Sequence, residues 1–546
     1  MINFKYTSIG IAVIAAMTLV ACVDDGKDGN NGVNGANGVN GSNGINGANG
    51  RDLTAVAKLT RVATLPLGAE VTGLFKTDNG ELFFNVQHPS DSLPAPENNA
   101  AVGIWTGLDL DKIDARLSSI SVPTANSAEQ NQVRVAVGQY QVLGRAGDTY
   151  AGALPFGLGG VVNNAGSASV KSSQDPDFNA FIATNVDGSQ GMLFTAWEDR
   201  PGAMSRLSLS RDSNNVWSVT DAKHIDFALV DGTIINCFGT LSPWGTPLTS
   251  EENYEAENTA KWNDPSYSSG YPNNADIDLL TDYLGGQFPN PYRYGYIVEI
   301  TQPTSPNPVP VKHFTLGRMA HENAVVMPDL KTVYLTDDGT GKAFYKFVAD
   351  NAADLSAGTL YAAKVKQDAT KDVAKAGFDI SWIRLGHATN AQLESWIASY
   401  DGIDRSDFVS GGNSYITDAE ISAWVAGAGD DRYAFLESLK AAAAKGATTE
   451  FRKMEGININ FNGVASNTIP FMYVAMSAVE STMSDAIGDI QLNQNRCGAV
   501  YRLGVHADYN VTRMEPVVVG GTYDSAAVNR CPVDRIASPD NLEVLN

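Results

Sequence analysis

The sequence predicts an all-β fold, and in particular a β-propeller, for most of the chain. Four segments share a pattern of a short apolar strand, a turn with Asp, Asn or Gly, and a second strand ending in polar residues; they are 70–89, 179–202, 322–339 and 468–480. Repeated hairpins that end on polar side chains are typical of propeller blades, whose inner strands face a central channel. The spacing of these segments is irregular, so a β-sandwich is the alternative fold.

One segment, 390–446, breaks this pattern and is predicted to be helical. It contains apolar residues at helical spacing, the capping sequence TDAE and an alanine-rich stretch. We interpret it as a helical insertion in the β domain. Its expected position is the rim, where it could cover the mouth of the channel.

Residues 1–21 are predicted to be a lipoprotein signal peptide. A lysine precedes an apolar run too short for a permanent membrane helix, and the run ends in LVAC, which resembles the lipobox of bacterial lipoproteins. Cys22 would then carry lipid; an ordinary signal peptide with a chance cysteine is the alternative. No other stretch of the sequence is long and apolar enough to span a membrane. We therefore expect an exported lipoprotein at the outer membrane, attached by its lipid anchor only and facing the periplasm or the cell surface.

Residues 22–55 are predicted to be a low-complexity tether that follows the lipidated cysteine. Glycine occupies every third position from Gly26, which is the spacing of a collagen-like triple helix. The tract contains no proline and is rich in asparagine, so a flexible polar tether is favoured over a trimeric stalk. We therefore expect a monomer, with a trimer as the alternative, and a folded domain over 56–546.

The charge of the chain limits its partners. With 38 basic and 61 acidic residues, the formal net charge is −23. This charge argues against nucleic acid as a partner and against docking of the domain on anionic lipid. An anionic substrate would need bound cations to overcome the field of the protein.

The four cysteines have different expected uses. Cys22 is the lipid site, and Cys497 and Cys531 lie 34 residues apart in the similar settings NRCGAV and NRCPVD. In an oxidising compartment these two form a plausible disulfide. Cys237 is then left without a partner, and a buried structural thiol is the simplest interpretation of it.

Acidic residues recur at the ends of predicted strands. Glu251 and Glu252 are adjacent, so on a strand only one of them would face a site, unless both are solvated loop residues. His321 and Glu322 precede an apolar strand, but the second histidine of a zinc protease motif is absent because position 325 is valine.

The last polar candidates lie near the end of the chain. Arg452, Lys453 and Glu455 occupy one predicted strand, where a cation for phosphate and a metal ligand could project together; an edge-strand ion pair is the alternative. Asp540 and the DDG sequence at 337–339 are also compatible with simple turns. Many acids, one thiol and six histidines favour a hard cation such as Ca²⁺ over zinc.

Several short motifs resemble those of the PhoX-type bacterial alkaline phosphatases, in the order found in that family. They include GTIINCFGTLSPWGTPLTSEEN, YRYGYIVEI, GRMAHENAVV, FRKMEGI and SPDN, and they extend over about residues 70–541. The resemblance implies a six-bladed propeller, a cluster of Ca²⁺ and Fe³⁺ at the end of the channel, and hydrolysis of small phosphate monoesters.

The resemblance also implies roles for individual residues. Cys237 would be a thiolate ligand of iron, and Glu252 a calcium or bridging ligand, with Glu251 as the alternative. Glu322 and Glu455 would complete the carboxylate shell, and Asp540 would bind calcium. The phosphate-binding arginine of the family corresponds to Lys453, with Arg452 beside it, and a lysine lacks the bidentate fork of an arginine.

The chain also departs from the family pattern at its C-terminal end, which is shorter than expected for a relative. A further carboxylate ligand and the closing part of the propeller would follow in the family. Two alternative functions therefore stay open: a non-enzymatic surface lipoprotein with a binding propeller, and a calcium-dependent propeller lactonase or related hydrolase.

Overall fold

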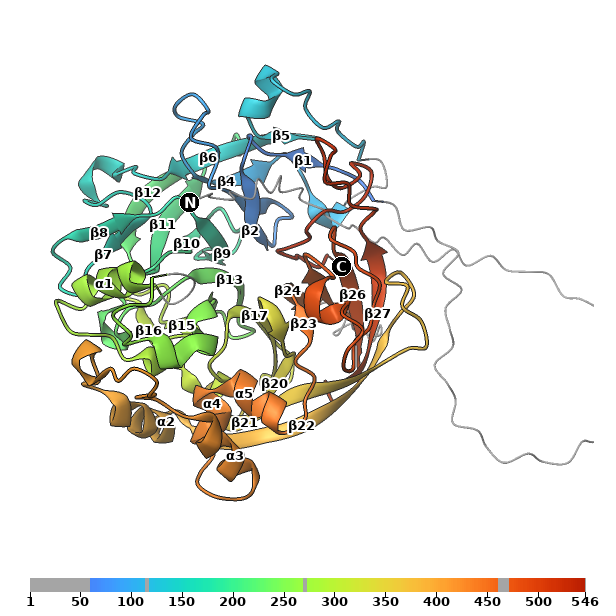
Figure 1. Cartoon of the computed structure of the whole chain (residues 1–546). Helices are drawn as coiled ribbons and strands as arrows, with labels where there is room; N and C mark the ends of the chain where they lie inside the picture. Colours follow the sequence, from blue (N-terminus) through green and yellow to red (C-terminus); the bar gives the residue numbers. More distant parts are fainter. Residues whose placement is uncertain (1–58, 113–116, 269–272, 460–470, 546) are drawn as a thin grey trace, which may run out of the picture.

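The computed structural model describes residues 59–112, 117–268, 273–459 and 471–545, and most of its regular structure is β. Antiparallel sheets follow one another around a common centre in the order of the chain (Figure 1). The predicted signal peptide, Cys22 and the Gly-X-Y tether lie outside the described residues.

Three sheets are each built from four strands that are consecutive or nearly so. Their strands, in order across each sheet, are β2 (Glu70–Lys76), β3 (Leu82–Gln87), β4 (Ala101–Thr106) and β6 (Gln139–Arg145); β9 (Pro176–Ala183), β10 (Gln190–Trp197), β11 (Ala203–Arg211) and β12 (Trp217–His224); and β13 (Asn236–Leu241), β14 (Pro247–Glu251), β15 (Ile297–Thr301) and β16 (Val309–His313).

A nine-stranded sheet completes the circle. In order across the sheet, its strands are β17 (His321–Val326), β18 (Thr332–Asp337), β20 (Tyr345–Asn351), β21 (Asp354–Gln367), β22 (Phe378–Thr389), β27 (Val511–Val519), β26 (Ala499–Val505), β25 (Phe471–Met476) and β24 (Met454–Ile459). The long strand β22 connects two four-stranded groups by pairing with β27 at Phe378 and Asp379. Short two-stranded sheets lie beside the larger ones: β1 (Ala63–Thr64) with β5 (Arg134–Val135), β7 (Gly160–Val162) with β8 (Ser169–Ser172), and β19 (Thr340–Lys342) with β23 (Phe451–Arg452).

The strands nearest the centre are β2, β9, β13, β17 and β24 (Figure 1). All residues of β17 and β24 are buried, whereas β12, at the outer edge of its sheet, has several exposed residues. The polar side chains that are buried on these inner strands are removed from bulk water and must find partners inside the protein. These inner strands carry the candidate site.

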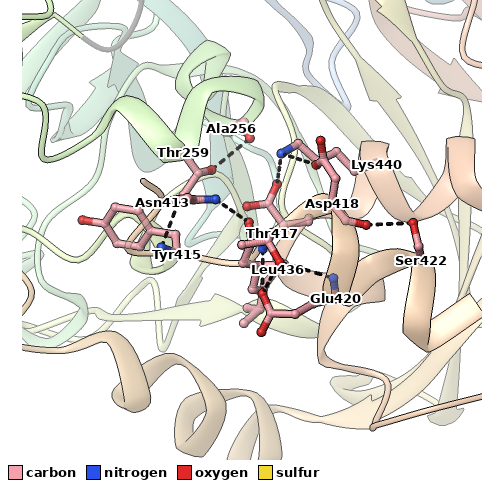
Figure 2. Close-up of polar contacts among 12 residues, drawn as sticks. Ala256, Thr259, Asn413, Tyr415, Thr417, Asp418, Glu420, Ser422, Leu436 and Lys440 are labelled. Carbon is pink, nitrogen blue, oxygen red and sulfur yellow. Dashed lines mark hydrogen bonds and ion pairs between the residues drawn. The ribbon is translucent and has the colours of Figure 1, made fainter. Parts of the chain in front are cut away.

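The helices expected in 390–446 are present; they are α2 (Asn390–Ile397), α3 (Asp418–Val425), α4 (Arg432–Leu436) and α5 (Ser438–Ala444). In Figure 1, α2 and α3 lie at the periphery of the ring, whereas α4 and α5 lie further inward, where they contact β22. The TDAE sequence forms a capping box, in which Thr417 and Glu420 exchange hydrogen bonds with each other's backbone N–H (Figure 2). A further helix, α1 (Asn274–Tyr283), lies between β14 and β15 in the chain. Within the described residues, no helix has both the length and the hydropathy needed to cross a membrane.

The segment 536–545 connects the first sheet to the last. The Asn541 side chain accepts a hydrogen bond from Gly73 N in β2 at 2.7 Å, and Asn458 Nδ2 in β24 donates to Glu543 at 3.1 Å. Gly456 allows this approach, because a Cβ there would lie 2.9 Å from Leu542 N. The disulfide between Cys497 and Cys531 holds the chain just before this segment.

Candidate metal centre

Acidic side chains from several sheets meet at the centre of the ring. We use the name central acidic cluster for the residues that form three overlapping groups of closely spaced ligand atoms: Asp177, Glu198, Cys237, Glu252, Glu322, Glu455 and Asp540. In each group the ligand atoms lie within 4.8 Å of one another. Since strands β9, β13, β17 and β24 each supply one member, the circular arrangement of the sheets is what assembles the cluster.

Cys237 belongs to two of these groups. Its Sγ is 3.1 Å from Asp177 Oδ2 and 3.0 Å from Glu322 Oε2, and all three residues are buried. Burial and the neighbouring carboxylates Asp177 and Glu322 raise the pKa of the Cys237 thiol. Between two buried carboxylates the thiol form is favoured, and a bound cation would be needed to stabilise the thiolate form that binds metal.

Lys453 lies at one side of the cluster. It forms ion pairs with Asp338 and, at 3.3 Å, with Glu455 Oε1. Tyr254 OH contacts Glu252 and donates to Asp338 Oδ2 at 2.7 Å. Lys453 is about one third exposed, so it connects these buried acids to solvent.

The pKa values show how strongly the acids are crowded. Burial, followed by the charges of neighbouring acids, raises the pKa of Glu252, Glu322 and Asp540 well above the ordinary range. Burial also raises the pKa of Glu455 to about 7. Burial opposes ionisation of Asp338 as well, but Lys453 lowers its pKa to about 2.

Several buried carboxylate oxygens of this region have no hydrogen-bond partner among the described residues. They are Asp177 Oδ1, Glu322 Oε1 and Asp338 Oδ1. A buried polar atom without a partner costs free energy, and carboxylate oxygens that converge without donors are the ligands that hard cations prefer. The cluster therefore fits metal ions. The positive charge of Lys453 cannot balance all of its acids, and bound cations would supply the remaining positive charge and would contact the carboxylate oxygens.

The structure separates the adjacent glutamates of the SEEN sequence. Glu252 reaches the cluster, whereas Glu251 does not: it accepts hydrogen bonds from the backbone N–H groups of Ile234, Gly295 and Tyr296 and forms an ion pair with Lys312 at 3.1 Å. The alternative that assigned Glu251 as a metal ligand is therefore not supported by the geometry.

Arg452 also lies away from the cluster. Its guanidinium contacts Thr340 and forms an ion pair with Glu480 at 2.9 Å, so of the two adjacent cations only Lys453 touches the central acids.

Four further residues were not assigned to the site from the sequence: Asp177, Glu198, Asp338 and Tyr254. Glu198 lies in the predicted hairpin 179–202, and Asp177 lies two residues before the start of that hairpin. Asp338 lies in the DDG sequence, which was equally compatible with a turn. The signal for these acids was their position at the ends of strands, but that signal did not distinguish site residues from turn residues.

The comparison with protein families shows to which family the chain belongs. A family model described as alkaline phosphatase PhoX matches residues 130–546. The chain belongs to this family. Membership in the PhoX family supports a metal-dependent phosphatase and does not favour the binding-propeller or lactonase alternatives.

Solved structures with detectable similarity differ strongly from this chain in sequence. Pseudomonas fluorescens PhoX, in complex with the transition-state analogue vanadate, is 19% identical, with 70% of this chain and 75% of that chain covered and a TM-score of 0.48. A putative 6-phosphogluconolactonase from Bacteroides fragilis is 8% identical, with 86% and 85% covered and a TM-score of 0.29. A β-xylosidase/α-arabinofuranosidase from a compost metagenome is 8% identical, with 81% and 93% covered and a TM-score of 0.28. No curated protein sequence matches the chain.

Proposed function

We propose that this PhoX-family protein hydrolyses small phosphate monoesters at the central acidic cluster, with Ca²⁺ and Fe³⁺ as its metal ions. The observation that carries the proposal is the set of buried carboxylate oxygens that have no hydrogen-bond partner among the described residues, in a cluster with Lys453 at one side. Acids alone would repel a phosphate, so the cluster becomes useful for phosphate chemistry only when it holds cations.

The types of ligand support a division between two metals. Cys237 would bind iron, together with Glu322 or Asp177, because a thiolate is a soft ligand that Ca²⁺ does not prefer. Glu455 and Asp540 offer oxygen ligands only and would bind calcium. Bound cations would neutralise the buried carboxylates and stabilise the charge on a transferring phosphoryl group.

Lys453 would bind the phosphate group of the substrate. Its backbone has a φ of 50°, a left-handed conformation that is uncommon for a lysine, and its N–H donates to Gly339 O at 2.8 Å. Asp338 and Glu455 hold its ammonium group at the edge of the cluster, where its partial exposure gives a substrate access to it. A lysine acts here as a point charge, since it cannot make the two parallel hydrogen bonds of an arginine.

Asp338 and Tyr254 would position the side chains of Lys453 and Glu252. Asp338 stays ionised because Lys453 lies next to it, and it accepts the hydrogen bond from Tyr254. Tyr254 also contacts Glu252, so these side chains fix one side of the cluster before any substrate binds.

The remaining proposals concern architecture and location. We propose that the ring is a β-propeller; the described residues contain five four-stranded groups, and the six blades implied by the family resemblance remain a prediction. Export as a lipoprotein through Cys22, attachment to the outer membrane and a monomeric state are proposed from the sequence alone.

Hydrolysis of p-nitrophenyl phosphate by the purified protein tests the function. Turnover should fall to background after chelation and return when calcium and iron are supplied together. Elemental analysis of the active protein should find both metals. Absence of turnover in a protein that contains both metals would exclude the proposal.

A further inference from the structure

The disulfide between Cys497 and Cys531 fixes a segment that has little regular structure of its own. Cys497 precedes β26, and Cys531 lies in the segment 520–545, which follows β27. In the part of the chain that the structure describes, this segment contains no helix or strand. It therefore lacks the continuous backbone hydrogen bonds that hold the sheets, and the disulfide and a few individual contacts must keep it in place.

The two cysteines of this disulfide differ in exposure. Cys497 is buried, and its backbone N–H donates to Asn495 Oδ1 at 3.0 Å, so it is fixed in the body of the domain. Cys531 is partly exposed, and residues 528–530 before it are exposed. A small thiol can therefore reach the sulfur of Cys531 from solvent without opening the core.

Cys497 also holds the segment through its backbone. Its carbonyl oxygen accepts a hydrogen bond from Ser538 N at 3.1 Å. Ser538 has a φ of 46°, a left-handed conformation that is uncommon for a serine and persists only where surrounding contacts impose it. Asp540, a member of the central acidic cluster, follows after Pro539. The contacts of Cys497 thus constrain the chain directly before a candidate metal ligand.

Asp540 differs from the other members of the cluster in how the fold supplies it. It comes from the segment 520–545, whereas the others lie in strands or directly after one. One of the three groups of ligand atoms contains Asp540, together with Glu322 and Glu455. The two groups that contain Cys237 do not include it. Displacement of the segment would therefore remove a ligand from one group and leave the other two unchanged.

We propose that the Cys497–Cys531 disulfide is a redox switch for the calcium site of the central acidic cluster. In the oxidised protein the disulfide holds Asp540 in its group of ligand atoms. In the reduced protein the segment gains freedom, and calcium binding weakens because ordering Asp540 then costs conformational entropy. The inference rests on the proposed function, in which Glu455 and Asp540 bind calcium and Cys237 binds iron.

The switch requires a reaction partner that exchanges electrons with the disulfide. Reduction breaks the S–S bond and forms two S–H bonds, with two electrons and two protons supplied by a dithiol, which itself becomes a cyclic disulfide. Such bonds are kept reduced in the cytosol, whereas exported proteins meet oxidising conditions. A chain that is exported, as the sequence predicts, would then acquire its calcium only after export.

Binding of radiolabelled Ca²⁺ to the full chain, measured by equilibrium dialysis without iron, tests the proposal. The double variant Cys497→Ala/Cys531→Ala should bind calcium about tenfold more weakly than the oxidised parent, and reduction of the parent by dithiothreitol should have the same effect. Dithiothreitol should leave the double variant unchanged, because it acts through the disulfide. Glu299→Gln, whose hydrogen bonds lie outside the cluster, controls for a general loss of stability and should bind calcium like the parent.

Two further measurements separate the switch from a general structural effect. Elemental analysis after loading with both metals should find iron at the parent level and less calcium in the double variant, because the groups that contain Cys237 do not need Asp540. In Asp540→Asn, calcium binding should be weak and should no longer depend on the disulfide. Circular dichroism checks folding, and the reduced parent provides the same comparison if the double variant does not fold.

Equal calcium affinity of the oxidised and reduced forms of the folded parent would overturn the proposal. A folded double variant that loses iron and calcium to the same extent would also overturn it, and so would an effect of the disulfide that persists in Asp540→Asn. An oxidised parent that binds neither metal would instead contradict the proposed function, and this inference would fail with it.

Discussion

Two neighbouring buried acids, Glu251 and Glu252, lie in opposite electrostatic environments. Glu251 accepts three backbone N–H groups and the ammonium group of Lys312, so both of its oxygens have donors. Glu252 faces other acids, and its nearest polar contact is the hydroxyl of Tyr254. The difference follows from the alternation of side chains along the strand that ends at Glu251.

This comparison separates a structural acid from a candidate metal ligand. Around Glu251 the charge is balanced, and the site needs nothing more to be stable. In the central acidic cluster, one oxygen each of Asp177 and Glu322 has no hydrogen-bond partner in the described part of the chain, and burial together with the neighbouring acids raises the pKa values of both residues. Burial of an acid therefore says little about its function, whereas a shortage of hydrogen-bond donors around buried acids indicates a metal site.

The largest effect is expected for Glu322→Gln. This change removes a carboxylate that faces Cys237 and whose Oε1 has no donor among the residues that the structure describes, so metal binding should fail and turnover of p-nitrophenyl phosphate should fall by about 10³-fold. The chelated variant should melt at a higher temperature than the chelated parent, because it lacks a buried carboxyl group whose ionisation burial and the neighbouring acids disfavour. Normal turnover together with full metal content would contradict the distinction between the two sites.

Glu251→Gln should act on stability instead. The substitution leaves the Lys312 ammonium group, which is 2% exposed, without its carboxylate, and should cost about 3 kcal/mol in the free energy of unfolding measured with urea. The double variant with Lys312→Met should be less destabilised than the single variant. Turnover per folded molecule should stay within a few-fold of the parent. A loss of activity without a loss of stability would place Glu251 in the site after all.

The adjacent cations Lys453 and Arg452 give a second contrast. Lys453→Gln should lower kcat/KM by about 10²-fold, because a charged donor for phosphate is lost. Arg452→Gln should change it only a few-fold, since that side chain contacts Thr340 and Glu480 outside the cluster. Equal effects of the two substitutions would show that the phosphate site extends to Arg452.

The smallest effect concerns pH and a second balanced acid, Glu299. Burial would raise its pKa, but hydrogen bonds from His313, Thr246 and Trp244 lower it to about 2, below the ordinary value of 4.5. Its contribution to stability is therefore present above about pH 4.5 and lost as the pH falls toward 2, and it amounts to about 2 kcal/mol. Urea unfolding between pH 5 and 2.5 should show a smaller loss of stability in Glu299→Gln than in the parent. Identical pH profiles would mean that these hydrogen bonds do not favour the ionised form.

Local patterns in the sequence predicted much of the β-structure. The segments 70–89, 179–202 and 322–339 correspond to the hairpins β2–β3, β9–β10 and β17–β18, and the TDAE cap begins α3. Alternation along a strand also predicted that only one of Glu251 and Glu252 could face a site. These features depend on residues close together in the chain, which a sequence shows directly.

Contacts between distant segments could not be predicted in the same way. Asp177, Glu198 and Asp338 are ordinary polar residues at strand ends until the circular arrangement brings them to the centre. The donors around Glu251 come from residues 234, 295, 296 and 312, and nothing local to Glu251 indicates them. The family resemblance supplied the positions of Cys237, Glu322, Glu455 and Asp540, but not the orientation of Arg452.

The hydrogen bond between Gly73 and Asn541 joins residues 468 positions apart, and Asp540 beside it belongs to the cluster. Contacts of such long range slow folding, because the entropy of closing the loop is lost before the contact is gained. Ions that bind only when every sheet is in place stabilise the closed ring against all partly open states. Metal occupancy would then measure how completely the ring has closed, so weakening the contact between residues 73 and 541 should lower metal affinity without changing any ligand.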